Sequence, residues 1–435
     1  MKLSYLITPT IAFAFGIALS TLSWSDDGDA TGWRQWRGSD QSGVAAGDAF
    51  PTKWSESDGV DWKAVIPGTG GSTPVAVGGR VYVTSGIEAK NMLLAYDFAS
   101  GKLLWQTAVG ADRGGKHRKG GGSNPSPVSD GELTIAYFRS GDLAAIDFDG
   151  KIVWQTNLQT EFGEDTLWWD LGTSPLLTDD AIVIAVMQSG PSYLVSLDKK
   201  TGKVNWKSDR SLGAPEEAAQ SYATPLEAVV DGRHVVVVMG ADHLTIHDLV
   251  TGDELGRLGG FNPGGERFFR SIASPVLSGD IVVCPYSRGA TVTGVSMSAL
   301  IDGKGDASIA WHRDDLGSDV PTPASQNGQV YFCSDKGVVT VIDAKSGESI
   351  WDVELPNSRH AYSSSPLVAG NHVYATREDG ATFVITGLSD DKSKLIATNV
   401  VDDDEPFTVA SLIAVDGSLL LRTRTTLYRI RGEGK

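Results

Sequence analysis

One short pattern returns eight times along this chain, and the repeat constrains the fold more than any other feature. Its fullest copy spans residues 174–206: a Ser-Pro step, an apolar stretch, a strand ending in Leu-Asp, and a Thr-Gly-Lys turn followed by Trp. Units of about 50 residues are too small to bury a core alone, and no linker separates them, so each must pack against its neighbours. The copies begin at Thr73, Ser126, Ser174, Thr224, Ser274, Thr322 and Ser365, with an eroded eighth copy at Ser411.

Each copy predicts four short strands. Tight turns such as Asp231-Gly232 and Asn327-Gly328 are strong hairpin signals, because a two-residue hairpin turn needs positive φ. A β-branched strand follows, then a strand ending in Asp, then the strand with the Trp. Four antiparallel strands per unit predict an all-β fold, the eight-bladed β-propeller. Seven blades is the alternative if the copy at Ser411 forms none.

The two ends of the repeat predict how the ring closes. Trp62 lies in a fourth-strand pattern that precedes the first Pro step, whereas the last copy stops at a third strand, Leu427-Tyr428-Arg429-Ile430. An open ring would leave an unpaired edge strand exposed. We therefore expect the N-terminal segment to supply the outer strand of the last blade.

The Trp that recurs in the fourth strand is interpreted as structural. One Trp at the same place in each blade is typical of packing between blades, with the indole N–H bonded to nearby backbone. The recurring Asp is likewise expected to accept hydrogen bonds within its turn. The fourth-strand residues are Trp62, Trp105, Trp154, Trp206, Trp311 and Trp351, and the fourth repeat has Gly256 at that place.

The N-terminus reads as an export signal. Lys2 precedes a mostly apolar stretch over 3–22, and small residues follow. We assign residues 1–25 to a signal peptide, 26–54 to a lead-in segment and 55–432 to the propeller. Retention of the segment as a membrane anchor is the alternative to cleavage, and no other stretch is apolar enough to span a bilayer. The expected location is the periplasm, the cell envelope or the exterior.

Charge and cysteine content narrow the partners. The chain has a formal net charge of −17, which argues against nucleic acid and anionic membrane surfaces as partners. Cys284 and Cys333 occupy similar places in the second strands of adjacent blades. Such positions are expected to be too far apart for a disulfide, so we expect two buried thiols, with a disulfide as the alternative. The chain is expected to be a monomer.

No familiar catalytic signature is present, so the loops that precede the Pro steps carry the functional prediction. There is no GxSxG, HExxH, Walker loop, paired CxxC or GxGxxG that opens a helix. In a propeller these loops rim one face of the central channel, and here they carry cations and additional aromatics that suit an anionic or sugar-like ligand or a peptide. A solvated rim with aromatics plugging the channel is the structural alternative. The candidate contact residues are Arg118, Lys119, Trp168, Trp169, Arg270, Arg359 and His360.

The blade pattern resembles the pyrroloquinoline-quinone (PQQ)-type propeller repeat. Its Pro opening, Leu/Ile-x-Asp strand and Thr-Gly-Lys-x-x-Trp turn recur over most of 55–432, and residues 33–44, Trp-Arg-Gln-Trp-Arg-Gly-Ser-Asp-Gln-Ser-Gly-Val, look like the lead-in of exported PQQ-binding-like propellers. These are related in fold to the outer-membrane assembly factor of the BamB type, a non-catalytic eight-bladed scaffold. The repeat marks blades rather than a site.

The resemblance implies two functions. Relatives of the BamB type bind protein partners through rim loops, although the lipid-bearing Cys of that factor is missing here. Quinoprotein dehydrogenases hold PQQ and calcium on the channel axis, often beside adjacent cysteines that this chain lacks. We therefore expect an exported scaffold, not an enzyme, that binds a protein or peptide and has no cofactor. The alternatives are a quinoprotein-type oxidoreductase with PQQ and calcium, and a carbohydrate- or polymer-binding module at the cell surface.

Overall fold

A computed structural model describes residue 1 and residues 32–387, 393–401 and 403–431. The predicted signal peptide and the first residues of the lead-in lie outside the described residues. The chain divides into two units, residues 1–30 and 31–435, and the second contains the propeller. Among the described residues, no helix is long and apolar enough to cross a membrane.

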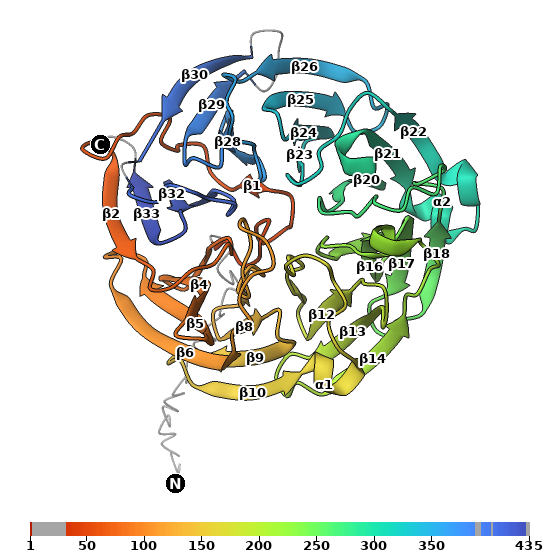
Figure 1. The fold of residues 1–435 in the computed structure, drawn as a ribbon, viewed down its shortest axis with the longest axis horizontal. Coiled ribbons are helices and arrows are strands. Elements are labelled where there is room, and N and C mark those ends of the chain that lie inside the picture. Colours follow the sequence, from red (N-terminus) through yellow and green to blue (C-terminus); the bar gives the residue numbers. More distant parts are fainter. Residues whose placement is uncertain (2–31, 388–392, 402, 432–435) are drawn as a thin grey trace. The chain divides into compact units, whose positions relative to one another are not determined.

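The second unit is an eight-bladed ring of antiparallel sheets, which confirms the predicted fold (Figure 1). From the channel outward, blades 1 to 4 are β3 (Val75–Val77), β4 (Arg80–Ile87), β5 (Lys90–Asp97) and β6 (Leu103–Ala111); β7 (Val128–Ser129), β8 (Leu133–Tyr137), β9 (Asp142–Asp147) and β10 (Ile152–Asn157); β11 (Leu176–Leu177), β12 (Ala181–Val186), β13 (Tyr193–Asp198) and β14 (Val204–Asp209); β15 (Leu226–Val230), β16 (Arg233–Gly240), β17 (His243–Asp248) and β18 (Glu254–Leu258).

The remaining blades repeat this order, and the two that adjoin the N-terminal segment each gain a strand from it. Blades 5 to 8 are β19 (Val276–Ser278), β20 (Ile281–Tyr286), β21 (Thr291–Ser296) and β22 (Ile309–Arg313); β23 (Ala324–Gln326), β24 (Gln329–Cys333), β25 (Val338–Asp343) and β26 (Ser349–Glu354); β1 (Val44–Ala45), β27 (Leu367–Ala369), β28 (His372–Thr376), β29 (Thr382–Thr386) and β30 (Lys394–Asn399); β31 (Ile413–Val415), β32 (Ser418–Arg422), β33 (Thr426–Arg431) and β2 (Val60–Val65).

In the part of the chain that the structure describes, helix occurs only as short segments between strands. They are α1 (Leu158–Phe162), α2 (Met297–Ile301) and the 3₁₀ turns η1 (Glu216–Ala219), η2 (Ser287–Gly289) and η3 (Gly305–Ser308).

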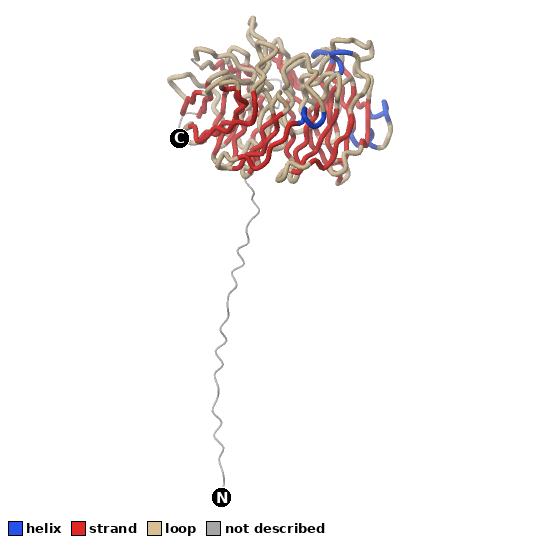
Figure 2. Tube along the Cα trace, turned by 60° about the horizontal axis from the view of Figure 1, so that its bottom comes forward, coloured by secondary structure: helices blue, strands red, loops and turns tan. Residues whose placement is uncertain are grey.

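The core lies between the blades. The middle strands are buried on both faces, as in β12, because a neighbouring blade covers each side of the sheet. The outer strands alternate between exposed and buried side chains, as in β6. Figure 2 shows the blades side by side, with long loops gathered at one face of the ring.

The Ser/Thr-Pro steps form a closed ring of hydrogen bonds around the channel. The side-chain hydroxyl of each step accepts the backbone N–H of the step before it, over 2.8–3.1 Å, and Thr73 closes the circle by accepting from Ser411. The following Pro lacks an N–H and holds the preceding residue extended, which leads the chain into the innermost strand. The ring includes the eroded copy at Ser411, so that copy is a blade.

Each fourth-strand Trp packs on the next blade. Trp154 donates its indole N–H to the Lys199 carbonyl at 2.8 Å, and the ring covers Gly202. Trp62, Trp105, Trp206 and Trp311 make the same bond to the following blade, over 2.9–3.1 Å. Trp351 has no such acceptor among the described residues, and the turn that follows β29 lies mostly in 388–392, outside them.

A short helix fills the place where the fourth repeat lacks its Trp. The longer turn of blade 5 forms α2, which packs against β18 of blade 4. Leu300 is buried there, and a Cβ placed on Gly256 would lie 3.1 Å from the Leu300 side chain. The α2 insertion of blade 5 therefore fills the space left by the missing indole of blade 4.

The N-terminal segment closes the ring twice. As predicted, β2 pairs antiparallel with β33 and completes blade 8. Sequence reasoning missed the second closure, in which β1 adds in parallel to β27 at the inner end of blade 7 (Figure 1). Residues 33–45, which end with β1, bond to inner strands of six blades, at Ala76, Ser129, Leu177, Glu227, Ser325 and Val368.

Both cysteines are free and buried, as expected. Burial raises the pKa of both thiols well above the usual range.

Candidate functional site

A cavity of about 570 Å³ lies on the propeller axis. Its lining includes Trp36 from the lead-in and the ring hydroxyls of Thr73, Ser126, Ser174, Ser365 and Ser411. Loops that precede the Pro steps and turns between second and third strands provide the remaining lining residues. The volume falls in the range of small-ligand pockets.

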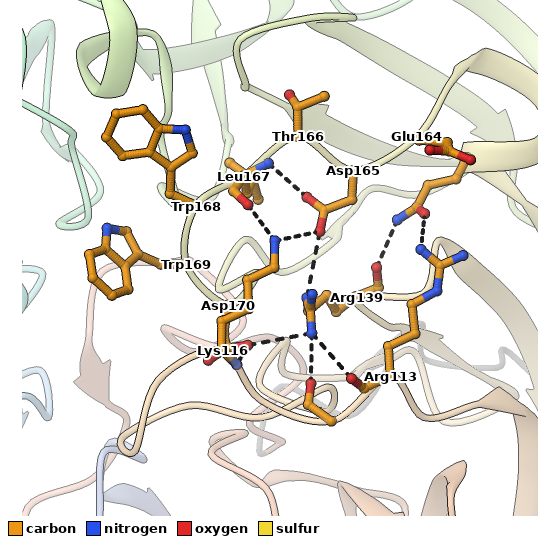
Figure 3. A network of polar contacts seen from close by, with 12 residues as sticks. Arg113, Lys116, Arg139, Glu164, Asp165, Thr166, Leu167, Trp168, Trp169 and Asp170 are labelled. Carbon is orange, nitrogen blue, oxygen red and sulfur yellow. Dashed lines mark hydrogen bonds and ion pairs between the residues drawn. The ribbon is translucent and has the colours of Figure 1, made fainter.

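Ion pairs hold two of these loops together, residues 113–122 and 164–170 (Figure 3). Lys116 donates to Asp165 at 3.0 Å and to the Leu167 carbonyl. Asp170 is buried and accepts the backbone N–H groups of Lys116 and His117 at 2.7 and 2.9 Å. The loop 113–122, which is basic and rich in glycine, is therefore held in place by the loop 164–170.

Figure 3 also shows that Trp168 and Trp169 take no part in that network and project from the same loop. Trp169 lines the axial cavity and donates its indole N–H to Glu217 at 2.7 Å. Trp168 lies outside the cavity lining and packs on Phe268, with 6.4 Å between ring centroids. The loop thus places one indole in the cavity and one on its rim.

Glu217 is a buried carboxylate that lines the axial cavity. Its carboxylate accepts from Trp169 and from Arg288 at 3.1 Å, and lies 3.8 Å from Arg270. Arg270 in turn pairs with Asp319 at 3.0 Å. The arginines compensate a carboxylate that would be costly to bury alone.

Two further groups that line this cavity carry shifted pKa values. Burial raises the pKa of Asp335, whose carboxylate accepts the Asp319 backbone N–H at 2.8 Å. Burial also raises the pKa of Tyr222, whose hydroxyl donates to Gln220 at 3.2 Å. Desolvation disfavours the ionised form of both groups.

Four of the seven predicted contact residues line the axial cavity: Arg118, Lys119, Trp169 and Arg270. Lys119 pairs with Glu378 at 2.5 Å. Arg359 and His360 do not line it and instead contact each other, with Arg359 Nε 3.2 Å from His360 Nε2.

The sequence analysis did not identify the acidic residues around the cavity, nor Arg288. Arg288, Asp335 and Glu378 lie in turns between second and third strands, and these turns reach the same face as the loops before the Pro steps. In a four-stranded blade, the turn between the second and third strands lies at the same face as the loop before the first strand. The predicted number of strands was therefore enough to place these turns beside the cavity. Glu217 and Asp319 lie in loops that precede Pro steps, but a single carboxylate in an acidic chain does not indicate a site.

The described residues assemble no calcium site on the axis. Calcium takes six to eight oxygen ligands. Here Glu217 and Asp319 are taken by arginines and Asp170 by backbone amides. Among the residues that the structure describes, no group of three or more His, Cys, Asp or Glu side chains is arranged to hold a metal ion.

The family model and the sequence relative agree on one family. The family model described as outer membrane protein assembly factor BamB matches residues 20–215, 171–303 and 302–411. The chain is 25% identical over 367 residues to the outer membrane protein assembly factor BamB of Burkholderia pseudomallei (strain K96243), covering 74% of this chain and 86% of the relative.

Two solved structures show the same fold. The BamB structure from Moraxella catarrhalis superposes with a TM-score of 0.59 and 15% identity, covering 84% of this chain and 95% of that one. The quinohemoprotein alcohol dehydrogenase from Comamonas testosteroni superposes with a TM-score of 0.67 and 13% identity, covering 94% and 82%. Because the family model matches most of the propeller, the chain belongs to the family of the outer membrane protein assembly factor BamB.

Proposed function

We propose that this chain is an exported, BamB-like scaffold that binds a protein or peptide partner through the loops around the axial cavity. Family membership supports a role in assembly, since the related Burkholderia protein is named as an outer membrane protein assembly factor. The N-terminal signal pattern supports export. The proposal involves no bond-making step and no cofactor.

The observation that carries the proposal is a group of exposed aromatics on pinned loops. Trp168, Trp169 and Phe268 are 45%, 41% and 53% exposed. The Lys116–Asp165 ion pair holds the loop that carries Trp168 and Trp169, and Arg288 donates to the Phe268 carbonyl at 2.7 Å. Large aromatic side chains on an ordered rim bind partners with little loss of conformational entropy.

The test is site-specific photo-crosslinking in cells, with a photoreactive amino acid at Phe268 or at Val250. Val250 is 79% exposed and lies in a turn between third and fourth strands, which reaches the other face. We expect a discrete protein adduct from position 268 and none from position 250. Equal labelling at both positions, or none at position 268, would contradict the proposal.

A double substitution then measures the contact. Trp168→Ala with Phe268→Ala should weaken binding of the crosslinked partner by tenfold or more and leave the unfolding midpoint unchanged, because both side chains are exposed. Trp169→Ala with Arg270→Ala is a poorer probe, since it removes partners of buried Glu217. Saturable binding of PQQ with Ca²⁺, followed by Trp fluorescence, would instead favour the oxidoreductase alternative.

A further inference from the structure

A second, smaller pocket lies beside the axial cavity and shares one wall with it. Its volume is about 200 Å³, and the shared wall contains the segment from His117 to Gly120. The other walls come from residues 69–71, 407–410 and 423–424. The pocket therefore joins the loop before blade 2 to the loops of blades 1 and 8.

Every charged side chain that lines this pocket is basic. Arg118, Lys119 and Arg424 line it together with His117, and none of its described lining residues is Asp or Glu. The charge of this pocket contrasts with that of the whole chain, which has a net charge of −17. The pocket is a local reversal of the molecule's charge.

Among the described residues, Arg118 and Arg424 lack the acidic partner that Lys119 has in Glu378. Arg424 stacks on Phe407, 4.7 Å from the ring centroid, and donates to the Arg118 carbonyl at 2.7 Å. Within the described chain, neither Arg118 nor Arg424 forms an ion pair with a carboxylate.

Two neighbouring glycines, Gly70 and Gly71, line the same pocket. The N–H groups of Gly70 and Gly71 reach no acceptor among the described residues. Glycine is required at both places, since an added Cβ would lie 2.8 Å from Arg422 at Gly70 and 2.8 Å from Val409 at Gly71. Backbone amides next to guanidinium groups favour an anion, because both supply donors and positive potential.

We propose that this pocket binds a compact oxyanion, and that the anion is the carboxylate of one acidic residue, or of the chain end, of the partner peptide. The assignment to a peptide rests on the proposed function, because the pocket shares a wall with the axial cavity that Trp169 lines. The volume admits one such group rather than a polyanion. The negative charge of the whole chain also opposes a strongly acidic partner.

The first experiment tests the pocket without a partner. Full-length mature protein is titrated with sodium acetate and, separately, with sodium phosphate at constant ionic strength, and the Gly70, Gly71 and Gly120 amides are followed by NMR. We expect saturable shifts with acetate. Arg118→Gln combined with Arg424→Gln should weaken acetate binding by about tenfold or more. The matched control is Arg257→Gln, an exposed cation on the outer strand β18 and outside the pocket, which should leave acetate binding unchanged.

The outcomes separate the pocket from its ligand. Shifts that fail to saturate, or that persist in the double variant, overturn the anion site. Binding of phosphate without acetate overturns the carboxylate assignment. Because Arg424 contacts Phe407, the single variant Arg118→Gln is measured beside the double one; its side chain is exposed and its loss leaves the packing unchanged.

The second experiment joins the pocket to the partner. The photo-crosslink from position 268 is repeated in the Arg118→Gln and Arg424→Gln background, and its yield should fall several-fold. An unchanged yield together with intact acetate binding in the wild type overturns the peptide carboxylate and leaves the scaffold function standing. Absence of any crosslink in the wild type refutes the scaffold function, while the acetate titration still decides the anion site.

Discussion

Gly202 meets two constraints that explain why the turn glycine recurs with the Trp. Its φ is +69°, a conformation that side chains other than glycine adopt at a cost. A Cβ there would also lie 2.6 Å from the Trp154 ring of the preceding blade. Gly101, Gly150, Gly252 and Gly347 repeat both features, with φ of +70° to +85° and an indole 2.5–2.7 Å from the added Cβ.

Gly202→Ala should therefore destabilise the protein by about 2–4 kcal/mol, the sum of backbone strain and overpacking. The control is Gly213→Ala, at φ +79° with nothing within 4 Å of the added Cβ, which reports the strain alone. Urea unfolding of both variants gives the difference. Equal losses of stability would show that contact with the Trp154 ring contributes nothing.

At the scale of the element, α2 shows how one repeat compensates for its neighbour. Leu300 is buried against Gly256, where six of the other blades place an indole. Leu300→Ala should cost about 2–4 kcal/mol, because it leaves a cavity beside Gly256. Val250→Ala, at an exposed position, should change stability by less than about 0.5 kcal/mol. If thermal unfolding shows a similar small effect for both, α2 does not substitute for the missing Trp.

The elements also show where sequence reasoning succeeds. The blades were predictable because Pro, Gly and Trp each obey a local geometric rule that repeats with the period. The α2 packing was not, since it depends on a pair of exceptions in different repeats, Gly256 and the longer turn before Trp311. Arg288 and Asp335 were missed because a side chain in a hairpin turn has no periodic signature, and only the assembled ring brings it to the cavity.

At the scale of the whole molecule, the ring is held by circular contacts rather than by any single interface. The hydroxyl ring passes through every blade and closes at Thr73 and Ser411. The lead-in adds a second set of contacts, because residues 33–45 touch six of the blades. A segment bonded to so many blades should unfold with them and not before them.

Arg37 is the test of this cooperativity. Its guanidinium is buried, donates to the carbonyls of Pro366 and Pro323 at 2.7 and 3.3 Å, and has its pKa lowered by burial to about 9, so it stays charged at neutral pH. Arg37→Ala removes these bonds and leaves a void.

The expected cost of Arg37→Ala is about 3 kcal/mol, seen in one cooperative unfolding transition. Ser39→Ala is the control, since its exposed hydroxyl donates to the nearby Gly32 carbonyl, at 2.7 Å. Limited proteolysis within 33–45 and the global unfolding midpoint are measured on the same samples. Cleavage of the segment at an unchanged midpoint would show a detachable strap; loss of both together would show that the lead-in is part of the ring.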